Sequence, residues 1–152
     1  MNHFVYSMPL GRLTIAADER GITRIEFGDV QLDMPRRPSA LTNTAATQLQ
    51  EYFAGKRKVF DVALDLQGTP FQLEVWNHLR EIPYGQTRTY ARIAEEIGRP
   101  RAFRAVGMAN NKNPVPIIVP CHRVVGANGS LVGYAAGIKV KRYLLELEGI
   151  DL

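Results

Sequence analysis

The residues best suited to chemistry in this 152-residue chain are a cysteine and a histidine that stand side by side. Cys121 is the only cysteine, and His122 follows it directly. The thiolate is the reactive form of cysteine, and a nearby imidazole that takes the proton is a usual way to produce it. The pair therefore predicts a sulfur nucleophile. The alternative is a buried, unreactive cysteine, since a lone cysteine is more often a small hydrophobic residue.

The segment that carries this pair is apolar and rich in proline. Pro114, Pro116 and Pro120 stand just before the cysteine, with β-branched residues between them. Proline at this density excludes a regular helix or a central strand, and the run is too apolar for a surface loop. We expect a stiff, buried segment that presents one thiol.

Two short helices are predicted before this segment. The first runs from Tyr90 to Ile97 and closes at Gly98, and Pro100 opens the second. Together they predict a helix-turn-helix. The second helix is slim enough to approach a DNA minor groove, because small residues recur along it. These residues are Ala102, Ala105, Gly107 and Ala109.

A last helix is expected over residues 138–149. Val140, Leu144 and Leu147 form its inward stripe, and Glu148 stands in its last turn. The helix dipole disfavours a carboxylate at that end, so Glu148 is expected to have a cationic or imidazole partner.

The first 67 residues predict a separate small α/β domain. Strands are expected over residues 3–7, 12–16 and 22–27 as an antiparallel meander, followed by a helix that stops at Gly55. Strict alternation over residues 60–66 predicts an additional strand. At Gly68 the pattern changes from strand period to helix period, with Thr69 as N-cap and Pro70 at the first helical position. We therefore expect two domains, 1–67 and 68–152.

Composition narrows the class of protein. Hydrophobic residues make up 45% of the chain, enough for a core, and the net charge of +4 suits a polyanionic partner. No apolar run approaches a membrane span, and the N-terminus lacks the pattern of a signal peptide. One cysteine cannot form an internal disulfide, and no zinc-ligand spacing is present. We expect a cytoplasmic protein without a metal or a membrane partner.

Three motifs resemble the active-site region of the O6-alkylguanine-DNA alkyltransferases, and the resemblance extends from Phe71 to Gly149. They are Arg104-Ala105-Val106-Gly107 followed by Ala109-Asn110, then Asn113-Pro114, and finally Pro120-Cys121-His122-Arg123-Val124. The resemblance implies an α/β protein with a ribonuclease H-like N-terminal domain and a winged-helix-like C-terminal domain. It also implies DNA repair by direct reversal, in which Cys121 takes the alkyl group from O6-alkylguanine in duplex DNA once and without a cofactor. We expect the protein to be a monomer.

The resemblance also assigns roles to residues. His122 takes the thiol proton through a water, Glu148 orients the imidazole, and Asn113 holds this network in place. Tyr90 neutralises the departing guanine, and Arg104 enters the stack that the flipped nucleotide leaves. The other matched positions wall the pocket, read the guanine edge or contact DNA: Pro116, Tyr134, the Cys121 and Val124 carbonyls, the Ala135 amide, Thr89, Ala105 and Gly107.

One departure leaves the substrate range open. Ala135-Ala136 stand where the family usually has Gly or Ser followed by Gly, and two extra methyl groups narrow or stiffen this loop. The range of alkyl groups, action on O4-methylthymine, cooperativity on DNA and the part played by residues 1–66 are not predicted. Three alternatives stand beside the alkyltransferase: a DNA-binding relative that does not repair, a helix-turn-helix regulator, and a Cys-His hydrolase.

Overall fold

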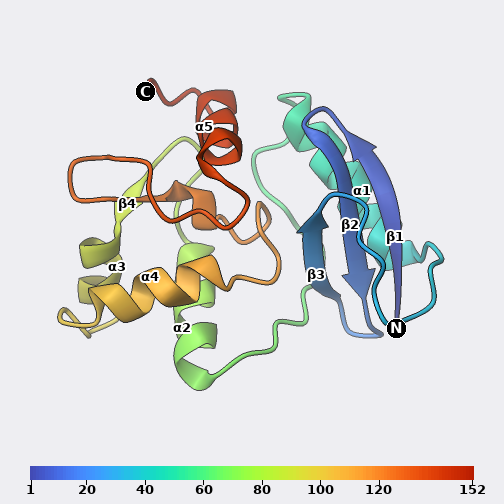
Figure 1. Ribbon diagram of the computed structural model, residues 1–152, viewed down its shortest axis with the longest axis horizontal. Coiled ribbons are helices and arrows are strands. Elements are labelled where there is room, and N and C mark those ends of the chain that lie inside the picture. The colour runs from blue at the N-terminus through green and yellow to red at the C-terminus, as the bar shows by residue number, and fades with distance from the viewer. The chain divides into compact units, whose positions relative to one another are not determined.

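Three strands in sequence order form the sheet of the first unit, Met1–Gln67, in a computed structural model that describes residues 1–152 (Figure 1). They are β1 (Asn2–Met8), β2 (Gly11–Ala17) and β3 (Ile22–Phe27), and both neighbouring pairs are antiparallel. Leu13 and Ile15 of the central strand are fully buried. The predicted meander is confirmed.

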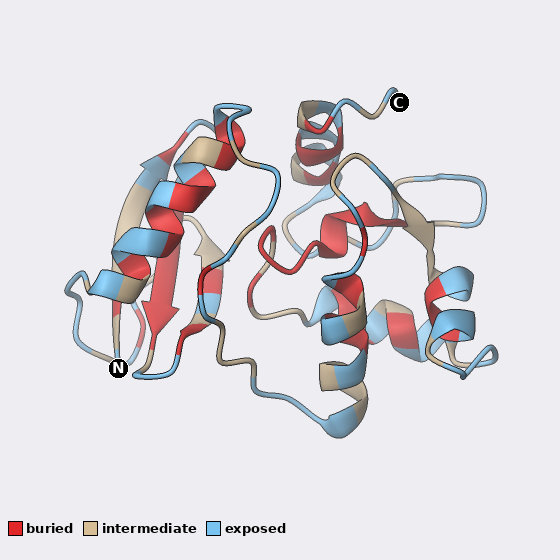
Figure 2. Cartoon of the chain, turned by 180° about the vertical axis from the view of Figure 1, so that it is seen from behind, coloured by how far each residue is buried: buried red, intermediate tan, exposed pale blue.

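Helix α1 (Ala40–Phe53) covers one face of this sheet (Figure 1). It begins with a capping box, in which the Ser39 side chain accepts a hydrogen bond from the Thr42 amide. Ala45 and Leu49 are fully buried, as their helical spacing predicts. Figure 2 colours parts of this helix and of the strands behind it as buried.

The strand expected over residues 60–66 does not form. The segment makes one parallel bridge, between Leu64 and Ile22 on β3. The backbone amide of Asp61 donates its hydrogen bond to a side chain, Gln48 Oε1, at 3.0 Å, and not to a neighbouring strand. Apolar residues alternate over residues 60–66 as in a strand. The backbone there hydrogen-bonds to a side chain, however, and does not form a continuous strand pairing.

The second unit, Gly68–Leu152, is mostly helical. Helix α2 (Pro70–Leu79) begins as predicted, with Thr69 as N-cap in a capping box with Gln72 and Pro70 at the first position. Trp76 is core, since it is 2% exposed and its Nε1 donates to the Ala109 carbonyl at 2.8 Å. This bond ties α2 to α4 (Phe103–Asn111), on which α3 (Tyr90–Glu96) also packs.

Helix α4 begins later than the sequence predicts. Pro100 lies in a turn closed by the Ala102 amide, which donates to the Arg99 carbonyl at 2.9 Å. Ala102 is therefore the N-cap, and Arg101 lies before the helix. The turn shortens α4, but α3 and α4 still form the predicted helix-turn-helix.

A short parallel pairing joins the start of α3 to the segment that carries the cysteine. Strand β4 (Arg88–Thr89) pairs with β5 (Val124–Val125), which follows a 3-10 helix, η1 (Cys121–Arg123). Tyr90 thereby begins its helix directly beside the strand that follows Cys121. The chain then turns back into α5 (Ile138–Leu147). None of the helices has the length and apolar character needed to cross a membrane.

Candidate active site

The segment before Cys121 is buried and stiff, as predicted. Val115 and the run from Ile117 to Val125 are buried, and Ile117 has a φ of 75°, a conformation that a β-branched residue rarely adopts. The side-chain amide of Asn113 holds the start of the segment with two hydrogen bonds, one accepted by its oxygen and one donated by its nitrogen. Its Oδ1 accepts from the Val115 amide at 3.0 Å, and its Nδ2 donates to the Val119 carbonyl at 2.8 Å.

Cys121 opens η1 and is only 4% exposed. Burial raises the pKa of its thiol to about 11, although hydrogen bonds from Asn113 and Tyr134 and the positive charge of Lys141 act to lower it. The sulfur is therefore protonated at neutral pH. It needs a base before it can act as a nucleophile.

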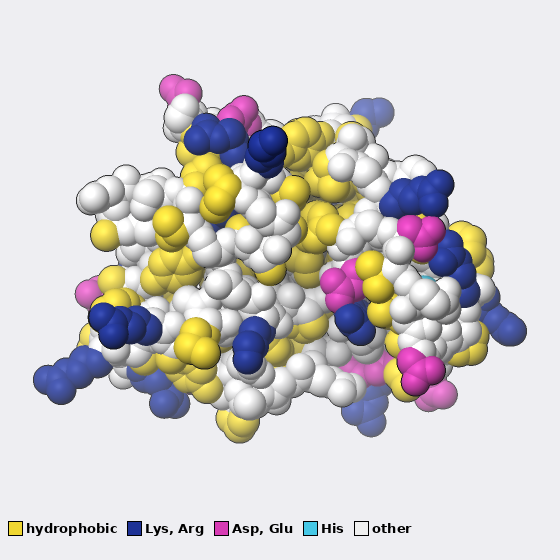
Figure 3. Space-filling model, viewed as in Figure 1, with side chains coloured by type: hydrophobic (Ala, Val, Ile, Leu, Met, Phe, Trp, Pro, Cys, Tyr) yellow, Lys and Arg dark blue, Asp and Glu magenta, His cyan; other side chains and the backbone are white.

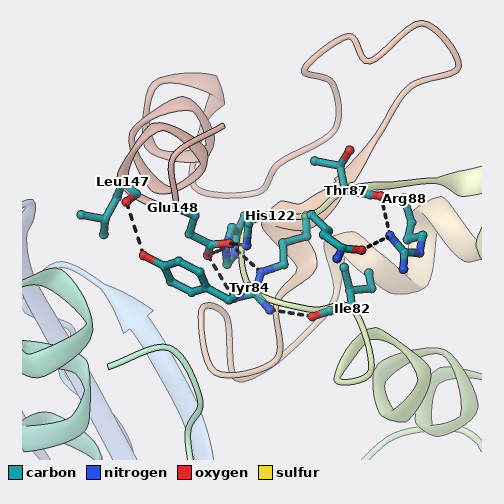
Figure 4. Close-up of polar contacts among 10 residues, drawn as sticks. Ile82, Tyr84, Thr87, Arg88, His122, Leu147 and Glu148 are labelled. Carbon is teal, nitrogen blue, oxygen red and sulfur yellow. Dashed lines mark hydrogen bonds and ion pairs between the residues drawn. The ribbon is translucent and has the colours of Figure 1, made fainter. Parts of the chain in front are cut away.

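The imidazole of His122 is held by Glu148. Its Nε2 lies 2.7 Å from Glu148 Oε2, and both side chains are fully buried (Figure 4). Burial lowers the pKa of His122, so the ring is neutral at neutral pH. Since a carboxylate only accepts hydrogen bonds, Nε2 carries the ring proton. Nδ1 then has the lone pair, and no protein group hydrogen-bonds it.

Glu148 is itself held by Arg123. The guanidinium donates from Nε to Oε1 at 2.9 Å and from Nη2 to Oε2 at 3.1 Å, and its Nη1 donates to the Ile82 carbonyl (Figure 4). The Gly85 amide adds a bond to Oε1 at 3.0 Å. Burial acts to raise the pKa of Glu148, but the hydrogen bonds from His122 and Arg123 and the positive charge of Arg123 outweigh it and hold the pKa at about 2. Glu148 is therefore ionised.

Lys141 is a second buried cation near the sulfur. It is fully buried in α5, and its Nζ donates to the Val124 carbonyl and, at 2.9 Å, to the Val132 carbonyl. Burial lowers the pKa of Lys141 to about 8. The Tyr90 hydroxyl donates to the same Val132 oxygen at 3.1 Å. The loop after η1 is thus tied to α3 and α5 through one backbone carbonyl.

The inward stripe predicted for α5 is partly wrong. Val140 and Leu147 are only half-buried, whereas Lys141 and Leu145 join Leu144 inside. The spacing 141, 144, 145 and 148 places all of these on the face that carries Glu148. That spacing was the signal that could have revealed Lys141, but a lysine is ordinarily assigned to the surface. Arg123 likewise belongs to the Pro120–Val124 motif, but the sequence predicts no role for it.

Two glycine positions border Tyr90. Gly107 of α4 packs against its ring, since a Cβ there would lie 3.7 Å from Tyr90 Cδ1. Gly133 has a φ of +66°, and a Cβ there would lie 3.2 Å from the Tyr90 hydroxyl. A side chain at position 133 would therefore be strained and would crowd the hydroxyl.

The other predicted site residues lie around this centre or on α4. Thr89 is the N-cap of α3 and accepts from the Arg92 amide at 3.1 Å. Pro116 is half-buried within the cysteine segment, and Tyr134 is half-buried in the loop that continues with the exposed Ala135. Arg104 and Ala105 are exposed on α4.

Both carbonyls predicted to read a guanine edge already accept hydrogen bonds within the protein. The Val124 carbonyl accepts from Lys141, and the Cys121 carbonyl accepts from the Asn110 side chain at 3.3 Å and from the Val124 amide. Their contact with a base stays a prediction. No group of three or more His, Cys, Asp or Glu side chains is arranged to hold a metal ion.

Both halves of the chain match family models. Residues 70–150 match the DNA binding domain of 6-O-methylguanine DNA methyltransferase, and residues 1–66 match the ribonuclease-like domain of the same protein. The chain belongs to the O6-methylguanine DNA methyltransferase family. The resemblance seen in the sequence motifs is confirmed, and so is the α/β fold with a helical DNA-binding domain.

Relatives within the O6-methylguanine DNA methyltransferase family match over nearly the whole chain. The methylated-DNA–protein-cysteine methyltransferase of Methanosarcina acetivorans is 50% identical, covering 98% of this chain and 99% of its own length. The constitutive enzyme of that name from Bacillus subtilis is 44% identical, with 99% and 98% covered. Among solved structures, Mycobacterium tuberculosis OGT in complex with DNA is 47% identical with a TM-score of 0.91, covering 97% of this chain and 92% of that one.

Proposed function

We propose that this chain repairs DNA by direct reversal, moving the alkyl group of O6-alkylguanine in duplex DNA to the sulfur of Cys121. The observation that carries the proposal is the arrangement of three residues, in which Glu148 hydrogen-bonds the imidazole of His122 and His122 directly follows Cys121. Glu148 accepts the Nε2 proton of a buried, neutral imidazole at 2.7 Å, and this leaves Nδ1, on the residue next to Cys121, with its lone pair available as a base. The names of the relatives, and the DNA bound in one solved relative, support the same activity.

The transfer is a displacement at carbon. The thiol proton passes to His122 Nδ1 through a bridging water, because the side chains of adjacent residues seldom bond each other directly. The sulfur then attacks the alkyl carbon, so that a carbon–sulfur bond forms and the bond from carbon to guanine O6 breaks. Glu148 stabilises the resulting imidazolium. The electron pair leaves with the guanine, which takes up one proton from solvent in place of the alkyl group, while the imidazolium releases the former thiol proton to solvent, so that protons balance overall.

Tyr90 is the donor for the departing guanine in this scheme. Burial raises the pKa of its hydroxyl, with the nearby Cys121 acting in the same direction. It therefore stays protonated and can donate a hydrogen bond to a ring nitrogen as negative charge develops there. Its present acceptor is the Val132 carbonyl, so this bond must exchange when a base enters.

We assign DNA binding to residues 68–152 as well, with α4 as the element that enters the minor groove. Arg104, Ala105 and Met108 are exposed along it, and no acidic residue lies in the helix. The O6 atom is out of reach in a stacked duplex, so the nucleotide must be flipped out at a cost of a few kcal/mol. Arg104 is the residue we expect to fill the space left behind.

The product is a thioether, which nothing in the chain is equipped to cleave, so each molecule reacts once and needs no cofactor. All side chains of the candidate site come from one unit of one chain, and we therefore propose that the protein acts as a monomer. A free nucleophilic thiol is typical of a reducing compartment, and we therefore propose the cytoplasm as the site of the activity.

Intact-mass spectrometry tests the proposal. The protein is incubated with duplex DNA that carries one O6-methylguanine, and its mass should rise by one methyl group in exchange for one hydrogen, located on Cys121 by peptide mapping. Cys121→Ser should gain nothing while its circular dichroism spectrum matches the wild type. Binding of the modified duplex without any gain in mass would identify a recognition protein instead of a repair protein.

A further inference from the structure

Phe103 is an exposed aromatic residue at the first position of α4. It is 44% exposed, although a phenylalanine at a helix start is free to turn its ring toward the core. A ring exposed to this extent can bury apolar surface when the chain binds a partner. The proposed repair function does not yet use this ring.

The position of Phe103 on α4 relates it to the candidate site. Phe103, Gly107 and Asn111 are spaced four residues apart and lie along one row of the helix. Gly107 packs against the ring of Tyr90. Asn111 lies beside Gly133, because a Cβ added to Gly133 would lie 3.6 Å from the side-chain amide of Asn111. Phe103 therefore lies at the N-terminal end of a row of α4 residues that contacts Tyr90 and Gly133 of the candidate site.

Arg104 lies over this ring. Its guanidinium carbon is 5.8 Å from the Phe103 ring centroid, within the range of a cation–π contact. The two side chains therefore form one unit of aromatic surface and positive charge. Ala102, the N-cap of α4, makes no side-chain capping bond, and the first turn contains no acidic residue.

The surroundings suit a polyanion with an apolar element. Arg99 and Arg101 precede the pair, and Met108, 64% exposed, follows on the Arg104 side of the helix. In Figure 3 the surface over α4 shows hydrophobic and Lys or Arg side chains together. DNA offers both phosphates and apolar sugar and base surfaces in its minor groove.

We infer that Phe103 is an apolar wedge that works with Arg104 in the minor groove, packing against the step next to the flipped nucleotide. This inference rests on the proposed function and adds a residue to it. Aromatic and aliphatic wedges in other minor-groove proteins loosen the step that they enter, and this eases extrusion of the neighbouring base. Phe103 and Arg104 then divide the work, since the ring loosens one step while the guanidinium fills the next.

The test compares duplex DNA carrying O6-benzylguanine with the free base O6-benzylguanine. For Phe103→Ala, the ratio of the duplex rate to the free-base rate should fall about tenfold, the scale of one lost stacking contact. Phe103→Leu should keep most of the ratio, because an apolar wedge does not need a ring. Tyr143→Ala, another exposed aromatic position in the same unit, should leave the ratio as in the wild type.

The salt dependence of DNA binding and the fluorescence of a base analogue distinguish an apolar wedge from a phosphate-binding residue. In a Cys121→Ser background, Phe103→Ala should weaken duplex binding without changing the slope of log K against log salt, because no phosphate contact is lost. The fluorescence of 2-aminopurine placed beside the lesion should rise on binding, and much less with Phe103→Ala.

Each outcome has one meaning. An unchanged ratio together with unchanged fluorescence overturns the wedge alone. A wild-type chain that takes no methyl group from duplex DNA carrying O6-methylguanine overturns the proposed function, and the wedge with it. Sedimentation that shows a dimer lost with Phe103→Ala assigns the ring to a second copy of the chain instead of DNA.

Discussion

Lys141 and Tyr90 donate hydrogen bonds to one shared acceptor, the carbonyl oxygen of Val132, at 2.9 and 3.1 Å. One donor comes from α5 and the other from α3, so a single backbone atom of the loop between η1 and α5 is held by two helices. When Tyr90 turns to a guanine, Lys141 remains as the attachment of this loop. The lysine therefore has two duties, holding the loop and placing a positive charge near Cys121.

Replacing Lys141 with methionine should slow alkyl transfer from duplex DNA and from free O6-benzylguanine by the same factor, at least about tenfold. The reason is that Lys141 acts at the sulfur and the loop, where both substrates react. Rates from quenched reactions and intact-mass spectrometry measure the effect. Lys139→Met, exposed on the same helix, is the matched control. A loss confined to duplex DNA would show that Lys141 serves DNA binding instead.

Removing the Tyr90 hydroxyl should slow the transfer roughly 100-fold, the scale of a lost proton donor. Tyr90→Phe also loses the bond to Val132, so the free energy of unfolding should fall by only about 1 kcal/mol. Stopped-flow rates with the free base give the first quantity, and urea unfolding gives the second. Tyr143→Phe, on the exposed side of α5, controls for loss of a phenol. An unchanged rate would remove Tyr90 from the mechanism.

The parts of this structure that follow from short stretches of sequence were predictable. Thr69 is the N-cap of α2, as expected, because its capping-box partner Gln72 lies only three residues further along the chain. The stiffness of the cysteine segment follows from its prolines in the same way. Glu148 was expected to have a cationic or imidazole partner, and it has both, in Arg123 and His122.

Features that depend on distant partners were not predictable. Residues 60–66 alternate like a strand, but a strand needs a continuous neighbour, and Gln48 supplied a side-chain acceptor instead. Pro100 fits a helix start by its own chemistry, yet the turn closed by Arg99 and Ala102 moves the start to Phe103. Lys141 is buried because two carbonyls, 9 and 17 residues away in sequence, meet at its ammonium group. No local sequence pattern predicts that these two carbonyls lie close to the Lys141 side chain.

Arg104 should matter for duplex DNA far more than for the free base. Arg104→Ala removes a cation that we expect inside the base stack, so the duplex rate should fall at least about tenfold more than the free-base rate, and the salt slope of binding should decrease by about 1. Binding titrations at several salt concentrations and paired rate measurements give both numbers. Arg142→Ala, exposed on α5, tests whether loss of any arginine has this effect. Equal losses on both substrates would argue against base flipping by Arg104.

Glu148 should govern the acid stability of the second unit. Its pKa is about 2 in the folded chain against an ordinary 4.5, so between these values the unfolded chain binds more protons than the folded one. The stabilisation is complete above pH 4.5 and is lost as pH falls toward 2, on the order of 3 kcal/mol in all. The wild type should therefore lose stability steeply over this interval.

Glu148→Gln should flatten that dependence, because glutamine does not titrate. At pH 7 the variant should be less stable by about 3 kcal/mol, since Arg123 is then buried without its counter-ion. Trp76 is the only tryptophan and is buried in the second unit, so its fluorescence in urea titrations from pH 2 to pH 7 reports on the right part of the chain. Glu146→Gln, an exposed partner of Arg142, should keep the wild-type slope. If Glu148→Gln also keeps that slope, the carboxylate is not ionised in the folded chain, and it cannot stabilise an imidazolium at His122.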